Sequence, residues 1–139
     1  MEKNEIERFL AHAKVSLVGS VDDEGYPNLK AMLKPRERLG MKEFYFTTNT
    51  SSLRTRQFLA NPKACLYFFH KGLFIYTGVM IKGNMEVLQD PDTKKRIWRK
   101  GDTLYYRQGV NDPDYCVLHF VAESGRYYRN LKTGSFVVD

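Results

Sequence analysis

Residues 43–56 of the chain read EFYFTTNTSSLRTR, an aromatic run that passes through a hydroxyl-rich turn into the start of a helix. The first part, Glu43 to Thr47, is typical of a β-strand. The helix is predicted from Ser52 to about Ala60, because Asn61-Pro62 disfavours a further helical turn. The first backbone N–H groups of a helix have no partner within it and carry a partial positive charge. Next to Arg54, they predict a site for a phosphate or another dianion.

A plainer interpretation of the same stretch stays open. Hydroxyl residues before a helix are usually N-caps, which stabilise a helix by about 1 kcal/mol each. Arginines on a short surface helix are usually solvated. The phosphate hypothesis therefore needs support from the rest of the chain.

Over the rest of the sequence, alternation of apolar and polar residues predicts a largely β chain. The expected strands are residues 15–21 and 28–34, joined by the turn at 22–27, then 43–47, 64–70, 73–88, 115–122, 126–131 and 135–138. Within 73–88, Gly78 and Gly83 indicate bulges or tight corners, and Ser124-Gly125 indicates a turn. Helices are expected over residues 4–13, 52–60 and 91–100, the last opened by Asp90-Pro91-Asp92.

These elements indicate a single domain over residues 1–139, mainly β, as a β-barrel with a few helices. Helices do not alternate with strands, so a parallel doubly wound sheet is disfavoured. The chain has neither a GxGxxG sequence nor a phosphate-binding lysine loop, which excludes the dinucleotide-binding and P-loop interpretations.

The composition bounds the possible partners. The net charge is +6 and the pI about 9.3, but the basic residues are scattered along the sequence, which argues against a nucleic-acid-binding stripe. The two cysteines, Cys65 and Cys116, lie in apolar runs and are expected to be free thiols. We find no signal peptide and no apolar run of membrane-spanning length. We therefore expect a cytoplasmic protein without a nucleic-acid or membrane partner.

Recognisable catalytic groups are missing from the sequence. There is no GxSxG sequence, no metal-ligand spacing among the three histidines, and no serine or cysteine with an evident paired base. Any reaction is therefore expected to depend on a bound cofactor, with no metal and with catalytic residues unknown. A phosphate site, aromatic walls and donors from a strand edge or Lys30 would suit flavin mononucleotide (FMN). Pyridoxal phosphate fits less well, because no lysine is marked as a Schiff-base former.

The same residues resemble a known family. The matching pieces, in family order, are residues 18–27 (VGSVDDEGYP), 44–49 (FYFTTN), 52–54 (SLR), 61–62 (NP), 83–87 (GNMEV), Asp90, Trp98 and 109–115 (GVNDPDY). Together they resemble the pyridoxamine 5′-phosphate oxidase-like, FMN-binding split-barrel superfamily, and most closely its general stress protein branch. The resemblance covers nearly the whole chain.

The resemblance implies a six-stranded antiparallel split barrel that forms a homodimer with flavin sites at the interface. By position, Lys30 would reach the flavin phosphate, Ala31 and Met32 would offer backbone groups to the ring, and Ser52 with Arg54 would hold the phosphate. Trp98, Tyr106 and Tyr128 would form a wall given by the other subunit. The full set of implied cofactor-binding residues is Lys30, Ala31, Met32, Thr47, Thr48, Asn49, Ser52, Leu53, Arg54, Trp98, Tyr106 and Tyr128.

The function expected from the residues and the resemblance is that of an FMN-dependent oxidoreductase acting on a small acceptor that the sequence does not identify. FAD or a deazaflavin could occupy the same groove. One alternative is a flavin-binding or flavin-storing stress protein without turnover. Another is a small basic barrel that binds single-stranded nucleic acid by aromatic stacking, recognisable by a steep salt dependence.

Overall fold

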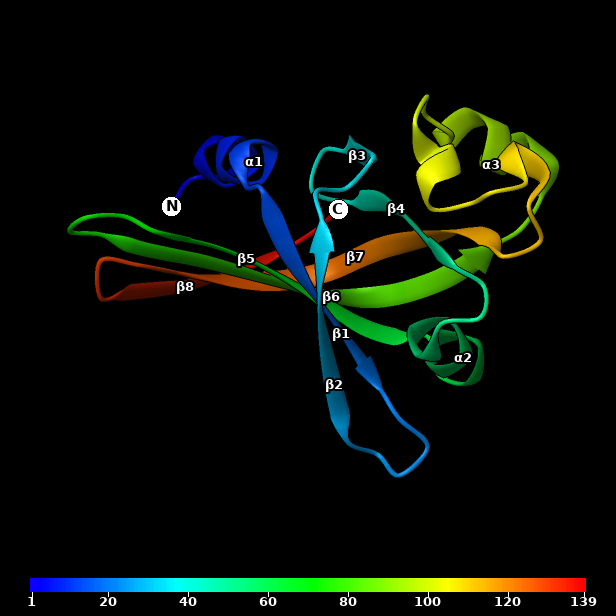
Figure 1. Ribbon diagram of the computed structural model, residues 1–139. Coiled ribbons are helices and arrows are strands. Elements are labelled where there is room, and N and C mark those ends of the chain that lie inside the picture. Colours follow the sequence, from blue (N-terminus) through cyan, green and yellow to red (C-terminus); the bar gives the residue numbers. More distant parts are fainter.

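The computed structural model describes residues 1–139 as one curved antiparallel sheet with helices along its margins (Figure 1). The strands are β1 (Val15–Val21), β2 (Pro27–Leu33), β3 (Glu37–Leu39), β4 (Glu43–Asn49), β5 (Lys63–Lys71), β6 (Tyr76–Leu88), β7 (Tyr115–Arg129) and β8 (Lys132–Val137). The helices are α1 (Lys3–His12), α2 (Leu53–Ala60) and α3 (Pro91–Ile97), with short 3-10 turns η1 (Asp102–Leu104) and η2 (Gly109–Asn111). None of the helices has the length and apolar character needed to traverse a bilayer.

The strands follow the order β2-β1-β5-β6-β7-β4-β3, with β8 paired to β7. The mainly β class is confirmed, but the count of six strands implied by the resemblance is wrong, because the sheet has eight. The strand β3 was not expected from the sequence, since three residues are too few to show an alternating pattern. Strands β2 and β3 form the two ends of the sheet, and only the short segment between Leu33 and Glu37 joins them.

Strand β7 is continuous where the sequence indicated a turn. Ser124 and Gly125 lie inside it, paired with β6 on one edge and β8 on the other. A Cβ on Gly125 would lie 2.4 Å from the Phe136 ring and 2.6 Å from the Met80 carbonyl oxygen, so close packing rather than a turn requires glycine here. The chain turns instead at Asn130-Leu131, both with left-handed backbone angles. Gly83 does mark a bulge, because the β6–β7 register shifts between Lys82 and Gly83.

Two apolar cores lie on opposite faces of β4 and β7. The larger one joins α1, α2 and the inner face of the sheet, with Phe44, Phe46 and Phe120 among its fully buried side chains. The smaller one, which includes Tyr106 and Tyr115, packs the segment from α3 to η2 against the other face. Because both faces of β7 are covered there, residues 115–118 are all buried, without the alternation of a one-sided strand.

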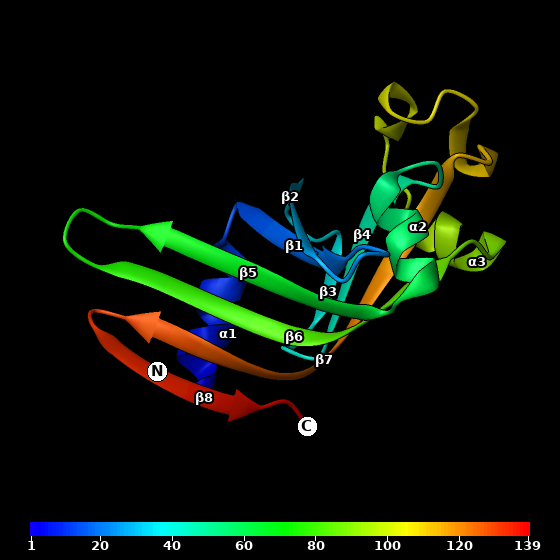
Figure 2. The same cartoon turned by 90° about the horizontal axis from the view of Figure 1, so that it is seen from below.

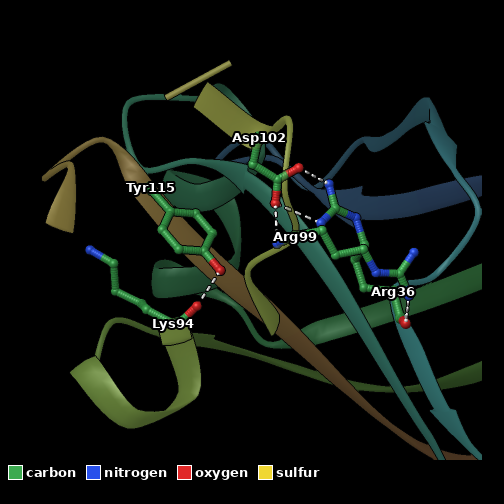
Figure 3. A network of polar contacts seen from close by, with 5 residues as sticks. All are labelled: Arg36, Lys94, Arg99, Asp102 and Tyr115. Atoms are coloured by element: carbon green, nitrogen blue, oxygen red, sulfur yellow. Dashed lines mark hydrogen bonds and ion pairs between the residues drawn. The ribbon is translucent and has the colours of Figure 1, made fainter. Parts of the chain in front are cut away.

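A buried ion pair ties the α3–η1 segment to the junction between β2 and β3 (Figure 3). Arg36 donates from Nη1 and Nη2 to the two carboxylate oxygens of Asp102, each at 2.7 Å. The same carboxylate accepts the Arg99 backbone N–H at 2.8 Å, and the Arg99 guanidinium donates to the Arg36 carbonyl oxygen. Nearby, the Tyr115 hydroxyl donates to the Lys94 carbonyl oxygen at 2.8 Å and anchors α3. These bonds fix the position of residues 99–106 relative to the sheet.

Replacing Asp102 with Asn should lower the free energy of unfolding by about 3 kcal/mol, because the largely buried Arg36 guanidinium would lose its counter-charge. Urea unfolding followed by Trp98 fluorescence measures this. The matched control is Glu37→Gln, which removes the carboxylate of the exposed Arg96–Glu37 pair and should cost less than about 1 kcal/mol. Equal losses in the two variants would contradict the assigned role of the buried pair.

The same pair predicts a pH dependence. The hydrogen bonds from the Arg36 guanidinium hold the pKa of Asp102 below its ordinary value. Since the folded-state pKa is depressed, the stabilisation is complete above the unfolded pKa of about 3.9 and is lost as pH falls through the folded value. The stability difference between wild type and Asp102→Asn should therefore shrink as the medium is acidified below about pH 4. A difference that stays constant on acidification would refute the linkage.

Candidate cofactor-binding site

A cleft of about 300 Å³ lies where the end strand β2 faces β4 and the first turn of α2. Its lining residues come from four parts of the chain: Lys30, Ala31, Met32, Leu33, Lys34 and Arg36; Phe46, Thr47, Thr48 and Asn49; Arg54; Tyr105 and Tyr106. The cleft therefore lies at the seam between the two ends of the sheet. No lining residue is an aspartate, glutamate, histidine or cysteine, so its ionisable side chains are cationic or phenolic.

The edge of β2 forms one side of the cleft. Strand β2 pairs with β1 on one edge only, from Pro27 opposite Val21 to Leu33 opposite Val15. Backbone groups on its other edge have no strand to pair with and are available to a ligand. Ala31 and Met32 lie toward the carboxyl end of this edge, among the residues that line the cleft. A flat molecule with alternating donors and acceptors along one side could pair with it.

Arg54 lies in the first turn of α2 and projects into the cleft without a carboxylate partner. Its Nε is buried and forms no hydrogen bond, and its Nη2 reaches only the Thr48 hydroxyl, at 3.4 Å. Burial lowers the pKa of the Arg54 guanidinium, because removal from water disfavours the charged form. A partly desolvated cation without a counter-charge is costly, and a bound anion would relieve that cost.

The turn before α2 is held by its own side chains. The Ser52 hydroxyl accepts the Thr55 backbone N–H at 3.2 Å, and the Thr55 hydroxyl donates to the Asn49 carbonyl oxygen at 2.9 Å. Asp114 accepts from the Asn49 amide at 2.9 Å and from the Ser51 backbone N–H at 2.8 Å. These bonds lower the pKa of Asp114, with the Ser51 backbone bond the strongest cause. The turn is thus rigid before any ligand arrives.

Aromatic side chains close the opposite side of the cleft. Tyr106 is buried and Tyr105 is exposed at the rim. The Tyr106 ring packs against Tyr115, with ring centroids 4.8 Å apart, and against Trp98 at 6.1 Å. Burial raises the pKa of Tyr106 and raises that of Tyr115 to about 12, so both phenols are neutral at physiological pH. The Arg36–Asp102 pair (Figure 3) holds this wall in place, and Arg36 itself lines the cleft.

Eight of the twelve residues predicted to bind a cofactor line this cleft: Lys30, Ala31, Met32, Thr47, Thr48, Asn49, Arg54 and Tyr106. The other four lie elsewhere. Ser52 acts as the N-cap of α2, Leu53 is exposed, and Trp98 lies behind Tyr106. Tyr128 lies near the far end of β7 beside Tyr76, with ring centroids 6.1 Å apart, and lines a different concave surface.

Five lining residues were not predicted: Leu33, Lys34, Arg36, Phe46 and Tyr105. Three of them adjoin predicted residues in sequence, so extending each predicted run by one or two positions would have found them. Lys34 is four positions after Lys30, so the two side chains share one face of the predicted strand, and this spacing could have identified Lys34 as a lining residue. Arg36 gave no signal, because its partner Asp102 is 66 residues away.

Comparison with known proteins identifies relatives of the whole chain. The family model for pyridoxamine 5′-phosphate oxidase matches residues 3–129. A solved structure from Clostridium acetobutylicum, described as related to general stress protein 26 of Bacillus subtilis and as a member of the pyridoxinephosphate oxidase family, is 37% identical. It superposes with a TM-score of 0.87 over 100% of this chain and 98% of its own.

Two more distant structures share the fold. General stress protein 26 from Bacillus anthracis is 14% identical, with a TM-score of 0.77 over 98% of both chains. A heme-binding protein from Mycobacterium smegmatis is also 14% identical, with a TM-score of 0.76 over 99% of this chain and 58% of its own. The family model and the 37% identical relative together show that the chain belongs to the pyridoxamine 5′-phosphate oxidase family.

Proposed function

We propose that the chain binds FMN in the cleft between β2 and β4 and acts as a flavin-dependent oxidoreductase. The observation that carries the proposal is Arg54 at the start of α2, whose half-buried guanidinium has an unbonded, buried Nε and no carboxylate partner. A phosphate monoester there would accept from Arg54 and from the helix N-terminus. Membership in the pyridoxamine 5′-phosphate oxidase family supports a flavin as the molecule that bears this phosphate.

The remaining lining residues fit the rest of such a ligand. The free edge of β2 at Ala31 and Met32 offers backbone donors and acceptors to a flat heterocycle. Lys30 and Lys34 add positive charge near that edge, and Thr47 and Thr48 offer hydroxyls to a polyol chain. A bound flavin supplies hydride and electron transfer. The lining has no carboxylate or imidazole, so the protein's own contribution is to bind, orient and electrostatically stabilise the ring.

We propose that a reduced nicotinamide is the electron donor and a small oxidised molecule the acceptor. The exposed Tyr105 at the rim leaves one side of the cleft open to such reactants.

A flavin-binding protein without turnover is the alternative, and it differs only in failing to oxidise the nicotinamide. The free thiols of Cys65 and Cys116 are compatible with a reducing, cytoplasmic location.

We further propose a homodimer whose second copy covers β2. Leu29 and Leu33 on this strand are exposed, which is unusual for large apolar side chains on one short strand. Leu33 also lines the cleft, so a subunit that covers it would help to enclose the ligand. Beside Leu29 lies a concave surface of about 710 Å³ that includes Tyr67, Met80 and Tyr128. Its partly apolar lining suits contact with a second copy.

The test of flavin binding is a visible absorption spectrum of the protein after addition of FMN and desalting. We expect wild type to retain the flavin, and Arg54→Ala to bind it about 10- to 100-fold more weakly, since a charged hydrogen-bonding partner of the phosphate is lost. Arg54→Lys should recover part of the affinity. The matched control is Arg56→Ala, an exposed arginine on the same helix that does not line the cleft.

Retention of flavin by Arg54→Ala at wild-type affinity would place the phosphate elsewhere. If the protein retained heme instead, recognised by its Soret absorption, then heme and not FMN would be its cofactor. Oxidation of a reduced nicotinamide by the flavin-loaded protein separates the enzyme from the storage alternative.

The dimer proposal predicts that Leu29→Asp dissociates the protein, because the buried interface would receive an unpaired charge. Flavin affinity should fall with it, and wild type should release flavin on dilution. Sedimentation velocity and flavin fluorescence measure the two effects. Leu59→Asp, at an exposed position of α2, is the control and should stay dimeric. A flavin-loaded wild-type monomer would exclude a site shared between subunits.

A further inference from the structure

Two hairpin turns lie side by side at one end of the molecule (Figure 2). The β5–β6 turn comprises residues 72–75, and the β7–β8 turn comprises residues 130–131. Thr77 pairs with Arg129 just behind them, and the Asn130 backbone N–H donates to the Tyr76 carbonyl oxygen at 3.4 Å. We call these two turns together the tip surface. It lies away from α2 and α3 (Figure 2), and none of its residues lines the cleft between β2 and β4.

Large apolar side chains project from the tip surface. Leu73 is 89% exposed, Phe74 90% and Leu131 85%. Leu131 also has a backbone φ of 67°, in the left-handed region that glycine and asparagine occupy more readily. Leucine there is strained without gaining any burial. A hairpin selected only for stability would carry small or polar residues in these positions.

Basic residues flank the two turns of the tip surface. Residues 63–85 and 124–138, which form most of β5 to β8, hold six of the 22 basic residues and none of the 16 acidic ones. The rest of the chain, which includes Glu86 of β6 and Glu123 of β7, thus carries 16 of each sign, and the net charge of +6 resides in these two segments. Lys71, Arg129 and Lys132 flank the turns directly. Oε1 of Glu5, on α1, lies 3.6 Å from Nη1 of Arg129, so this carboxylate offsets one of these positive charges.

We propose that the tip surface docks on a membrane surface rich in anionic lipids, with Leu73, Phe74 and Leu131 entering the interfacial layer. Such a surface binds apolar side chains that have lysine and arginine beside them, because the apolar groups enter the interfacial layer and the basic groups are attracted to the anionic lipids. The contact needs no spanning segment, and it revises the expectation from sequence that no membrane is a partner. The proposal does not depend on flavin binding.

A lipid surface suits this geometry better than an acidic protein. A specific protein interface buries about 800 Å² on each partner over a contiguous complementary patch. The three apolar side chains project from turns and do not line any of the larger concave surfaces of the molecule. Adjacent projecting turns can enter a deformable layer together without a shaped pocket opposite them.

The experiment is co-sedimentation of the full chain with vesicles of phosphatidylcholine alone and of phosphatidylcholine mixed with phosphatidylglycerol. We expect binding to the anionic vesicles only, weakened by salt. The double variant Leu73→Ser/Phe74→Ser should bind at least about tenfold more weakly, because two large apolar side chains no longer leave water. Lys132→Glu should lose about fivefold or more, as expected for a basic residue near an anionic bilayer.

Matched controls lie on other parts of the molecule. Leu104→Ser changes a leucine that is 83% exposed in η1, and Lys100→Glu reverses an exposed charge beyond α3. Both should bind vesicles like wild type. Circular dichroism verifies that every variant is folded.

Three outcomes would overturn the proposal. The first is that wild type does not bind anionic vesicles. If it binds polyglutamate or oligothymidylate instead, the partner would be an acidic protein or a nucleic acid, respectively. The second is an equal loss in Leu104→Ser and in the tip variant. The third is a tip variant that becomes monomeric in sedimentation velocity, which would assign the turns to contact between copies of this chain.

Discussion

The structure depends on strand β7 pairing with three other strands. Along one edge it pairs with β6 over nearly its whole length, and along the other it pairs first with β4 and then with β8. The exchange of partners occurs around Ala122 and Glu123, whose backbone groups bond to Lys42 and Val138 at the ends of the two partner strands. Opposite this point, a Cβ at Gly83 would lie 2.0 Å from the Val121 carbonyl oxygen, so only glycine permits the register shift.

This branching shapes the two ends of the molecule. Where β7 pairs with β4, the sheet curves until β2 and β4 face each other without pairing, and the cleft forms in that seam. Where β7 pairs with β8, it extends with β5 and β6 as a ribbon of two hairpins (Figure 2). One strand therefore positions both the candidate cofactor site and the tip surface, at separate places on the molecule.

The candidate site combines rigid support with an uncompensated charge. Hydrogen bonds from Asp114 and Thr55 hold the turn before α2, and the Arg36–Asp102 pair holds the aromatic wall. Arg54 between them is partly desolvated and has no carboxylate partner. An uncompensated charge that lowers the stability of the free protein is common at binding sites, where the bound ligand offsets the cost. By mass action, an anion that binds only the folded chain also stabilises the fold.

The sequence by itself determined most of the local elements and indicated most of the residues that line the cleft. Alternation of apolar residues located most of the strands, although it missed β3 and divided β7 in two. The hydroxyl-rich turn followed by Asn61-Pro62 delimited α2. These signals act between residues a few positions apart. The predicted runs Lys30 to Met32 on β2 and Thr47 to Asn49 on β4 supplied six of the thirteen cleft residues. Only the tertiary structure decided which side chains pair over long distances. Arg36 meets Asp102, Ser52 turns to its own helix, and Gly125 packs beneath Phe136 instead of forming a turn. Such contacts depend on strand register and packing, which no short stretch of sequence encodes.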